Sequence, residues 1–185
     1  MGKNRFMDIK DSIRTIPDFP IQGIQFRDIT SLLESPEALN KALIDMTASC
    51  MRFKASKIVG IESRGFIFSS PIARDMEIPF ILARKPGKLP NPTHRKEYEL
   101  EYGTSELHIQ KCSNLTKNDK IVIIDDLIAT GGTAYACAEL ISQSFNIPKE
   151  NILILAVIDL PDLGGSKLIK QTGYNIEALI EFEGE

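Results

Sequence analysis

Residues 121–133 read Ile-Val-Ile-Ile-Asp-Asp-Leu-Ile-Ala-Thr-Gly-Gly-Thr and are the most informative stretch of this 185-residue chain. Four apolar residues precede the two acids, as in a central parallel strand that is covered on both faces. The pattern predicts that the strand ends in the two carboxylates and turns through a Thr/Gly loop into a helix from Thr133 to Ser144. Ligands of open parallel sheets lie at the carboxyl ends of the strands. The stretch therefore predicts an α/β fold with a ligand site at residues 125–133.

The loop itself has the features of an anion site. Gly131 and Gly132 lack a Cβ, so the backbone can approach a ligand closely while successive N–H groups converge on it. The following helix adds N–H donors and partial positive charge at its N-terminus. A phosphate at Thr130 to Thr133 would be held largely by main chain, with the hydroxyls as further donors. The two acids would repel that phosphate, so we expect them to face sugar hydroxyls, or a magnesium ion and its waters.

Residues 125–133 resemble the phosphoribosyl diphosphate signature of the type I phosphoribosyltransferases, and this variant of the string is similar to the adenine branch of that family. The resemblance covers nearly the whole chain from about Pro17. A Walker loop is excluded, because Gly-Lys-Ser or Gly-Lys-Thr is absent after Gly131. A purely structural strand-turn-helix remains the alternative. The resemblance implies that the ribose 5-phosphate loop consists of Asp125, Asp126, Ala129, Thr130, Gly131, Gly132 and Thr133.

Length and composition are those of one globular domain, with 43% hydrophobic residues. The alternating patterns predict a twisted, mainly parallel sheet flanked by helices. Residues 1–35 do not fit the alternation and residues 174–185 return to strand character, so we expect a small hood built from about 1–35 and 161–185. The expected elements are a helix to Met51, a strand at 58–62, a helix at 65–76, strands at 79–84, 105–110 and 121–124, the helix at 133–144, a strand at 152–160, and a final helix-strand pair.

Charge and cysteine content limit the function classes. The formal net charge of -3 and the sequence pI near 5.5 argue against a general nucleic-acid binder. The N-terminal residues lack a hydrophobic segment, so we expect no membrane association and a cytoplasmic location. Three widely spaced cysteines, Cys50, Cys112 and Cys137, support neither a disulfide framework nor a zinc site.

A second site element follows the strand at residues 58–62. Backbone N–H groups at the start of the next helix and the guanidinium of Arg64 could grip a diphosphate from the side. The segment resembles the diphosphate-binding loop of the family, which implies that Glu62, Ser63 and Arg64 contact diphosphate. It also implies a cis peptide bond between Glu62 and Ser63. The alternative is a helix N-cap by Ser63 with a surface arginine.

Residues 85–103 are expected to form a flexible, cationic flap. Three prolines and two glycines forbid a continuous helix there. Closure of such a loop would exclude water and limit hydrolysis of an activated sugar. By resemblance, Arg84, Lys85 and Lys88 match the diphosphate-contacting positions of the family. A solvated basic loop is the alternative.

The proton that an incoming purine gives up needs an acceptor. In hypoxanthine-guanine relatives an aspartate stands at the position of Ala129, and a methyl group cannot replace it. The segment Leu-Glu-Tyr-Gly at residues 100–103 resembles the base of the family's flap, so Glu101 is the candidate catalytic residue, beside Tyr102 of the flap. Desolvation by flap closure would raise the pKa of this carboxyl group toward the working range. An exposed surface glutamate is the alternative.

The purine needs a flat apolar slot with a few polar edges. The ring of Phe26 can stack on a base, and main-chain groups from Gln25 to Arg27 can pair with its edge. This segment resembles the family's hood, although Phe26 could also be a core residue. Leu127 or Ile128 would complete the slot on the other face.

The resemblance implies purine salvage: transfer of the 5-phosphoribosyl group from 5-phosphoribosyl 1-diphosphate to adenine, giving AMP and diphosphate. The implied cofactor is Mg²⁺, bound mainly through substrate rather than by a direct protein site. The implied partners are these small molecules and a second copy of the chain in a homodimer, without nucleic acid or membrane. The rivals are a relative acting on orotate, xanthine or hypoxanthine-guanine, and a regulator that binds phosphoribosyl diphosphate without catalysis.

Overall fold

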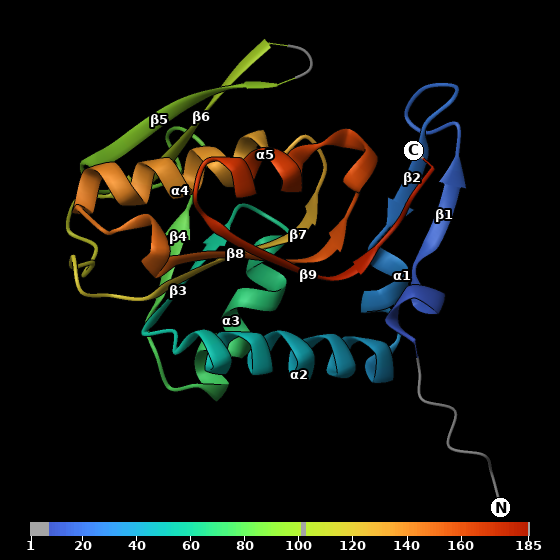
Figure 1. Cartoon of the computed structure of the whole chain (residues 1–185), viewed down its shortest axis with the longest axis horizontal. Coiled ribbons are helices and arrows are strands. Elements are labelled where there is room, and N and C mark those ends of the chain that lie inside the picture. Colours follow the sequence, from blue (N-terminus) through green and yellow to red (C-terminus); the bar gives the residue numbers. More distant parts are fainter. Residues whose placement is uncertain (1–7, 101–102, 185) are drawn as a thin grey trace, which may run out of the picture.

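The structure, a computed structural model, describes residues 8–100 and 103–184 (Figure 1). The strands are β1 (Arg14–Pro17), β2 (Gln25–Asp28), β3 (Lys57–Ile61), β4 (Phe80–Ala83), β5 (Thr93–Leu100), β6 (Gly103–Gln110), β7 (Ile121–Ile128), β8 (Ile152–Asp159) and β9 (Asn175–Glu181). The helices are α1 (Thr30–Leu33), α2 (Pro36–Phe53), α3 (Gly65–Asp75), α4 (Gly132–Phe145) and α5 (Gly165–Gln171), with 3-10 turns η1 (Ile9–Ser12), η2 (Lys149–Asn151) and η3 (Pro161–Leu163). In this described part, no helix is both long and apolar enough to cross a bilayer.

A five-stranded sheet in the order β4-β3-β7-β8-β9 forms the centre of the molecule, and all its strand pairs are parallel. Helices α4 and α5 cover one face, and α2 and α3 cover the other (Figure 1). Each face has its own apolar core: Val122 and Leu155 pack with Met46 of α2, whereas Ile123 and Ile154 pack with Cys137 of α4. This arrangement confirms the predicted mainly parallel α/β fold.

Strand β7 is longer than the sequence pattern predicted. We expected it to end at the two acids, but its pairing with β8 continues through Asp125 to Ile128, which lies opposite Asp159. Both acids therefore belong to the strand. Their backbone is held by ladder hydrogen bonds, so they are less mobile than loop residues.

The flap region contains a β-hairpin. Strands β5 and β6 pair antiparallel from Thr93 opposite Gln110 to Leu100 opposite Gly103, so a strand stands at 93–100 where we expected an irregular loop. The hairpin lies along α4 (Figure 1), with the ring of His94 edge-on to Phe145 at 5.2 Å between centroids. The prolines all precede β5, and from there alternate residues face the helix.

The two ends of the described chain contact each other, but they belong to different sheets. Strands β1 and β2 form a small antiparallel sheet, and the guanidinium of Arg27 stacks over the Phe182 ring at 4.5 Å. Strand β9, however, is the parallel edge strand of the central sheet. The assignment of residues 161–185 to the hood was therefore wrong for 175–181, because the backbone of β9 pairs with β8.

Candidate active site

The site lies at the carboxyl ends of β3 and β7, which are neighbours in the sheet. A cavity of about 300 Å³ opens there. It brings the loop after β3 together with the acids of β7 and with Tyr98 and Ser105 of the hairpin, two residues that no motif singled out. Its lining residues are Ile61, Glu62, Ser63, Arg64, Lys85, Tyr98, Ser105, Asp125, Asp126 and Thr133.

A second cavity, of about 190 Å³, adjoins the first. The two share Arg64, Asp125 and Thr133, so they lie next to each other. The remaining lining of the second cavity is the Thr/Gly loop with the residues on either side, 127–132 and 134. The loop predicted for a sugar 5-phosphate therefore borders open space, and helix α4 begins at Gly132 with its free N–H groups beside it.

The two acids of β7 differ in environment. Asp126 is buried and accepts a hydrogen bond from Nε of Arg64 to its Oδ2 at 2.5 Å. Burial opposes the charge of Arg64, but the Asp126 carboxylate outweighs it, so the pKa of Arg64 lies above its ordinary value. Burial, followed by the negative charge of Asp126, raises the pKa of Asp125 well above its ordinary value. Asp125 also accepts the backbone N–H of Asp126 at 2.9 Å.

Glu62 and Arg84 form a two-pronged ion pair at the edge of the first cavity. Arg84 Nη2 donates to Oε1 at 2.9 Å and Nε donates to Oε2 at 3.2 Å, while the Lys85 backbone N–H also donates to Oε2 at 2.9 Å. The hydrogen bonds from Arg84 hold the pKa of Glu62 below its ordinary value. Arg84 Nη1 donates to the Lys88 carbonyl oxygen at 3.0 Å. The Glu62–Ser63 peptide bond is cis, as the resemblance implied.

Of the basic residues assigned to diphosphate, Arg64 and Lys85 line the first cavity, and Arg84 and Lys88 are not among the described residues that line these two cavities. Arg84 is turned to Glu62 instead. The structure does not cap α3 with Ser63: the N-cap is Arg64, without a side-chain capping bond. The N-cap alternative for Ser63 is therefore wrong.

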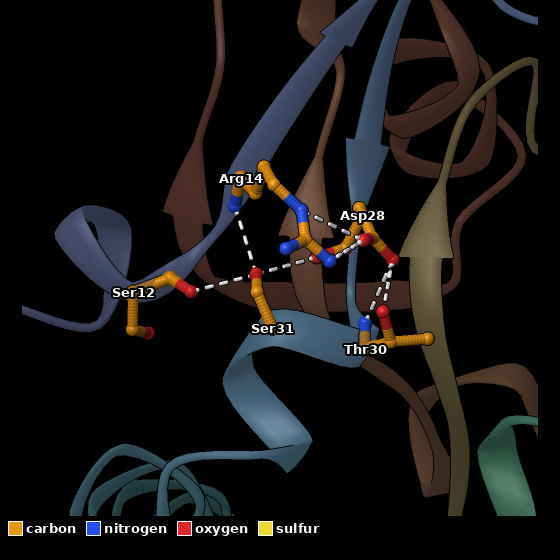
Figure 2. A network of polar contacts seen from close by, with 5 residues as sticks. All are labelled: Ser12, Arg14, Asp28, Thr30 and Ser31. Atoms are coloured by element: carbon orange, nitrogen blue, oxygen red, sulfur yellow. Dashed lines mark hydrogen bonds and ion pairs between the residues drawn. The ribbon is translucent and has the colours of Figure 1, made fainter.

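The hood holds the base-binding candidates on β2, and a polar network fixes the end of that strand (Figure 2). Asp28 Oδ2 accepts from Arg14 Nη2 at 2.6 Å, and Oδ1 accepts from the hydroxyl and backbone N–H of Thr30 at 2.6 and 3.0 Å. The Thr30 hydroxyl, followed by Arg14, keeps the pKa of Asp28 below its ordinary value. Ser31 Oγ accepts the Arg14 N–H at 2.9 Å and lies 2.8 Å from the carbonyl oxygen of Ser12, to which it donates.

The predicted purine slot is only partly assembled. Phe26 packs edge-on against Phe19, with ring centroids 5.0 Å apart, and Gln25, Phe26 and Arg27 are not among the described residues that line the two cavities. Leu127 and Ile128 do line the second cavity, but Ile128 is 1% exposed and belongs to the core. Of these two side chains, Leu127 is therefore the one that a ligand can contact. Glu101 and Tyr102 lie outside the described residues.

Two glycines whose packing the sequence did not predict lie directly against residues 124–131. A Cβ on Gly65 would lie 2.4 Å from the carbonyl oxygen of Ile124, and one on Gly165 would lie 2.2 Å from that of Ala129. The available signals were the glycine directly after Arg64 and the Gly-Gly pair at 164–165. Neither signal identifies the partner segment, because that depends on the tertiary fold.

Comparison with known proteins agrees with this geometry. Residues 28–155 match the model of the phosphoribosyl transferase domain. The adenine phosphoribosyltransferase of Actinobacillus succinogenes is 45% identical over 183 residues, which cover 98% of this chain and 99% of that protein. Among solved structures, the adenine phosphoribosyltransferase of Thermoanaerobacter pseudethanolicus has a TM-score of 0.83 at 43% identity, covering 94% of this chain and 98% of its own. The enzyme of Giardia lamblia, solved with 9-deazaadenine, has a TM-score of 0.87 at 34% identity, covering 96% and 99%. The chain therefore belongs to the phosphoribosyltransferase family, in its adenine phosphoribosyltransferase branch.

Proposed function

We propose that this chain is a purine salvage enzyme that transfers the 5-phosphoribosyl group from 5-phosphoribosyl 1-diphosphate to adenine, forming AMP and diphosphate. The observation that carries the proposal is the pair of adjoining cavities at which the Thr/Gly loop, the Asp125–Asp126 pair and the loop after β3 come together. A sugar with a phosphate at one end and a diphosphate at the other needs these three elements in this order.

The two cavities suggest a role for each element. The loop from Ala129 to Thr133 anchors the 5-phosphate through main-chain N–H groups and hydroxyls. Asp125 and Asp126 accept hydrogen bonds from the ribose hydroxyls. On the diphosphate side the contacts come from Ser63, Arg64 and Lys85, which line the first cavity, while Glu62 holds Arg84 beside them. Catalysis is then mainly positioning and electrostatic stabilisation of the leaving diphosphate, and no covalent nucleophile is required.

Magnesium fits this donor set. Mg²⁺ keeps several waters and binds through one or two carboxylates together with substrate phosphates. Three carboxylates line the first cavity, and two of them, Asp125 and Asp126, are not paired with Arg84 as Glu62 is. When bound, the ion neutralises charge on the diphosphate. Asp125 and Asp126 would hold it through its waters and through the ribose oxygens.

The purine is proposed to lie between Phe26 of the hood and Leu127 of β7, with main-chain groups from Gln25 to Arg27 at its edge. Glu101 is proposed as the group that exchanges a proton with a ring nitrogen of adenine. The methyl group of Ala129 leaves no alternative proton acceptor at that position.

A homodimer in the cytoplasm completes the proposal. Its support is an apolar face on the outer helices: Ile44 and Met51 of α2 are 59% and 65% exposed, and Ile67 of α3 is 41% exposed. Apolar patches of this kind are typical of protein interfaces. The three cysteines are free thiols, which is the usual state in a reducing compartment.

The decisive experiment offers adenine, hypoxanthine, guanine and orotate separately with 5-phosphoribosyl 1-diphosphate and magnesium, and measures nucleotide and diphosphate. We expect AMP from adenine alone, loss of turnover when the metal is chelated, and much slower turnover in Glu101→Gln with unchanged binding of 5-phosphoribosyl 1-diphosphate. A nucleotide from another base would refute the adenine assignment. Absence of nucleotide from every base would leave a binding protein.

A further inference from the structure

The amino end of α5 touches the back of the Thr/Gly loop. Gly165, the first residue of α5, donates its N–H to the carbonyl oxygen of Ala129 at 3.2 Å. A Cβ on Gly165 would lie 2.2 Å from that oxygen, 2.5 Å from the nitrogen of Gly131 and 2.6 Å from the carbonyl carbon of Thr130. All three are main-chain atoms, so none could turn away as a flexible side chain would.

The contact is reciprocal, but the two glycines are required for different reasons. Gly131 has a φ of +79°, which glycine adopts readily. A Cβ there would also lie 2.9 Å from the Cα of Gly165. Gly165 has no positive φ and begins a helix, so alanine could adopt its backbone conformation. At Gly165 it is therefore contact with the loop, and not the backbone conformation, that excludes a side chain.

We propose that Gly165 is a positioning residue that holds residues 129–131 in the conformation that receives the 5-phosphate. The inference rests on the proposed function, because the phosphate is that of 5-phosphoribosyl 1-diphosphate. A binding site works when its groups are held within about 0.5 Å of the productive geometry. Real Cβ contacts begin at 3.0 Å, and the nearest atom would be at 2.2 Å, so a side chain at Gly165 displaces the main chain by about 0.8 Å.

The front of the loop approaches the hairpin at one point. A Cβ on Gly132 would lie 3.2 Å from the carbonyl oxygen of Glu99 in the hairpin. Gly132 therefore lies close to the backbone of β5, while the loop as a whole borders the second cavity. A shift forced by a Cβ at Gly165 changes the direction of the loop N–H groups, because the atoms that this Cβ meets are main-chain atoms of residues 129–131.

The test compares Gly165→Ala with Gly164→Asn. Gly164 has a φ of +76° and nothing within 4 Å of its Cβ position, and asparagine tolerates that conformation. Calorimetric titration with ribose 5-phosphate should show binding weakened roughly tenfold to a hundredfold in Gly165→Ala and within about twofold of wild type in Gly164→Asn. Binding of magnesium diphosphate, which uses the loop after β3, should stay unchanged in both variants. The KM for 5-phosphoribosyl 1-diphosphate should rise in Gly165→Ala.

Wild-type affinity for ribose 5-phosphate in Gly165→Ala would overturn the proposal. So would an equal loss of both ligands, which indicates general damage to the fold. If Gly165→Ala does not fold, the wild-type protein gives a second test: on titration with ribose 5-phosphate, the NMR signal of the Gly165 amide should shift together with those of residues 130–133. A Gly165 signal that does not shift would overturn the proposed positioning role of Gly165.

The two proposals fail separately. A wild-type protein that binds ribose 5-phosphate but forms no AMP would refute the proposed function and leave the role of Gly165 intact. A wild-type protein that forms AMP, with a Gly165→Ala variant of unchanged ribose 5-phosphate affinity, would refute only the role of Gly165.

Discussion

Asp125 illustrates how one residue can oppose stability in favour of function. Its pKa is raised by burial and by Asp126, so the folded state binds its proton more tightly than the unfolded state does. Stability is therefore lost as the pH rises from the unfolded pKa, near 3.9, through the raised folded pKa. This loss persists at neutral pH. The site retains a carboxylate at a position where a neutral side chain would fold better.

We expect Asp125→Asn to be more stable than wild type at pH 7.5, because the amide avoids burying a charge beside Asp126. The gain should shrink as the pH falls toward 4, and kcat/KM should fall roughly tenfold or more because the ribose loses a charged acceptor. Urea unfolding at both pH values and steady-state kinetics measure these effects. A variant less stable than wild type at pH 7.5 would contradict the argument.

For Asp28 we expect the opposite dependence of stability on pH. Its pKa is lowered by Thr30 and Arg14, so its contribution is complete above the unfolded pKa and is lost as the pH falls through the folded one. Asp28→Asn should destabilise the protein by about 2 kcal/mol at pH 7, with a smaller difference at pH 3. Because Asp28 fixes the end of β2, the KM for adenine should rise while that for 5-phosphoribosyl 1-diphosphate stays unchanged.

Asp11 offers the matched control for Asp28. It lies in η1, also in the hood, and is exposed. Asp11→Asn removes the same charge, and both the stability and the KM for adenine should stay near wild type. Equal effects of the two substitutions would point to net charge rather than to the network in Figure 2.

Among the elements, the hairpin is the one whose docking is easiest to perturb. Lys96 of β5 lies 3.8 Å from Glu139 of α4 and donates to Gln143 at 3.4 Å. Partly exposed pairs of this kind contribute about 0.5 kcal/mol. Lys96→Met should therefore leave global stability almost unchanged, but should speed amide exchange in residues 93–110 about twofold. The control Lys111→Met changes an exposed lysine just beyond β6 and should leave amide exchange in residues 93–110 unchanged.

Glu139 joins the hairpin to the rest of the α4 face. Its Oε1 accepts the hydroxyl of Tyr174 at 2.7 Å and lies 3.6 Å from Nζ of Lys149. Burial, together with this bond to Glu139, raises the pKa of Tyr174. The hairpin therefore rests on a preformed polar cluster.

At the scale of the whole molecule, stability and chemistry lie at opposite ends of the sheet. Lys57, at the amino end of β3, pairs with Asp119 at 2.8 Å, and their side chains are 9% and 12% exposed. Asp119→Ala should cost about 3 kcal/mol, because it leaves a buried charge unpaired, without changing kcat/KM of the folded enzyme. Adding Lys57→Met should recover part of the loss in denaturant unfolding. A lower kcat/KM of Asp119→Ala under conditions in which the variant is fully folded would contradict the separation of stability from chemistry.

The proposed homodimer is also a property of the whole molecule. Met51→Lys places a charge on the apolar face of α2 and should convert a dimer into a monomer, as measured by sedimentation. Leu168→Lys on α5, at a side chain 45% exposed, is the matched control and should leave the mass unchanged. A wild-type protein that sediments as a monomer would refute the dimer itself.

The sequence by itself determined the features that depend on neighbours in the chain. Apolar runs and helical periodicity predicted the α/β alternation, since each element must bury its own apolar residues. The run from Asp125 to Thr133 predicted the anion loop, because its glycines and the following helix act within a few residues. The loop after β3 was predicted in the same way, from a strand, a turn and a helix start that are adjacent in the chain.

Only the tertiary structure decided the features that join distant segments. Pairing with β8 carries β7 through its acids and draws β9 into the sheet, Glu62 holds Arg84, and Gly165 packs on the loop at Gly131. Each of these is a contact between segments more than twenty residues apart. The physical reason is that strand pairing and close packing are decided by which partner is adjacent after folding, and no local pattern of residues specifies that partner.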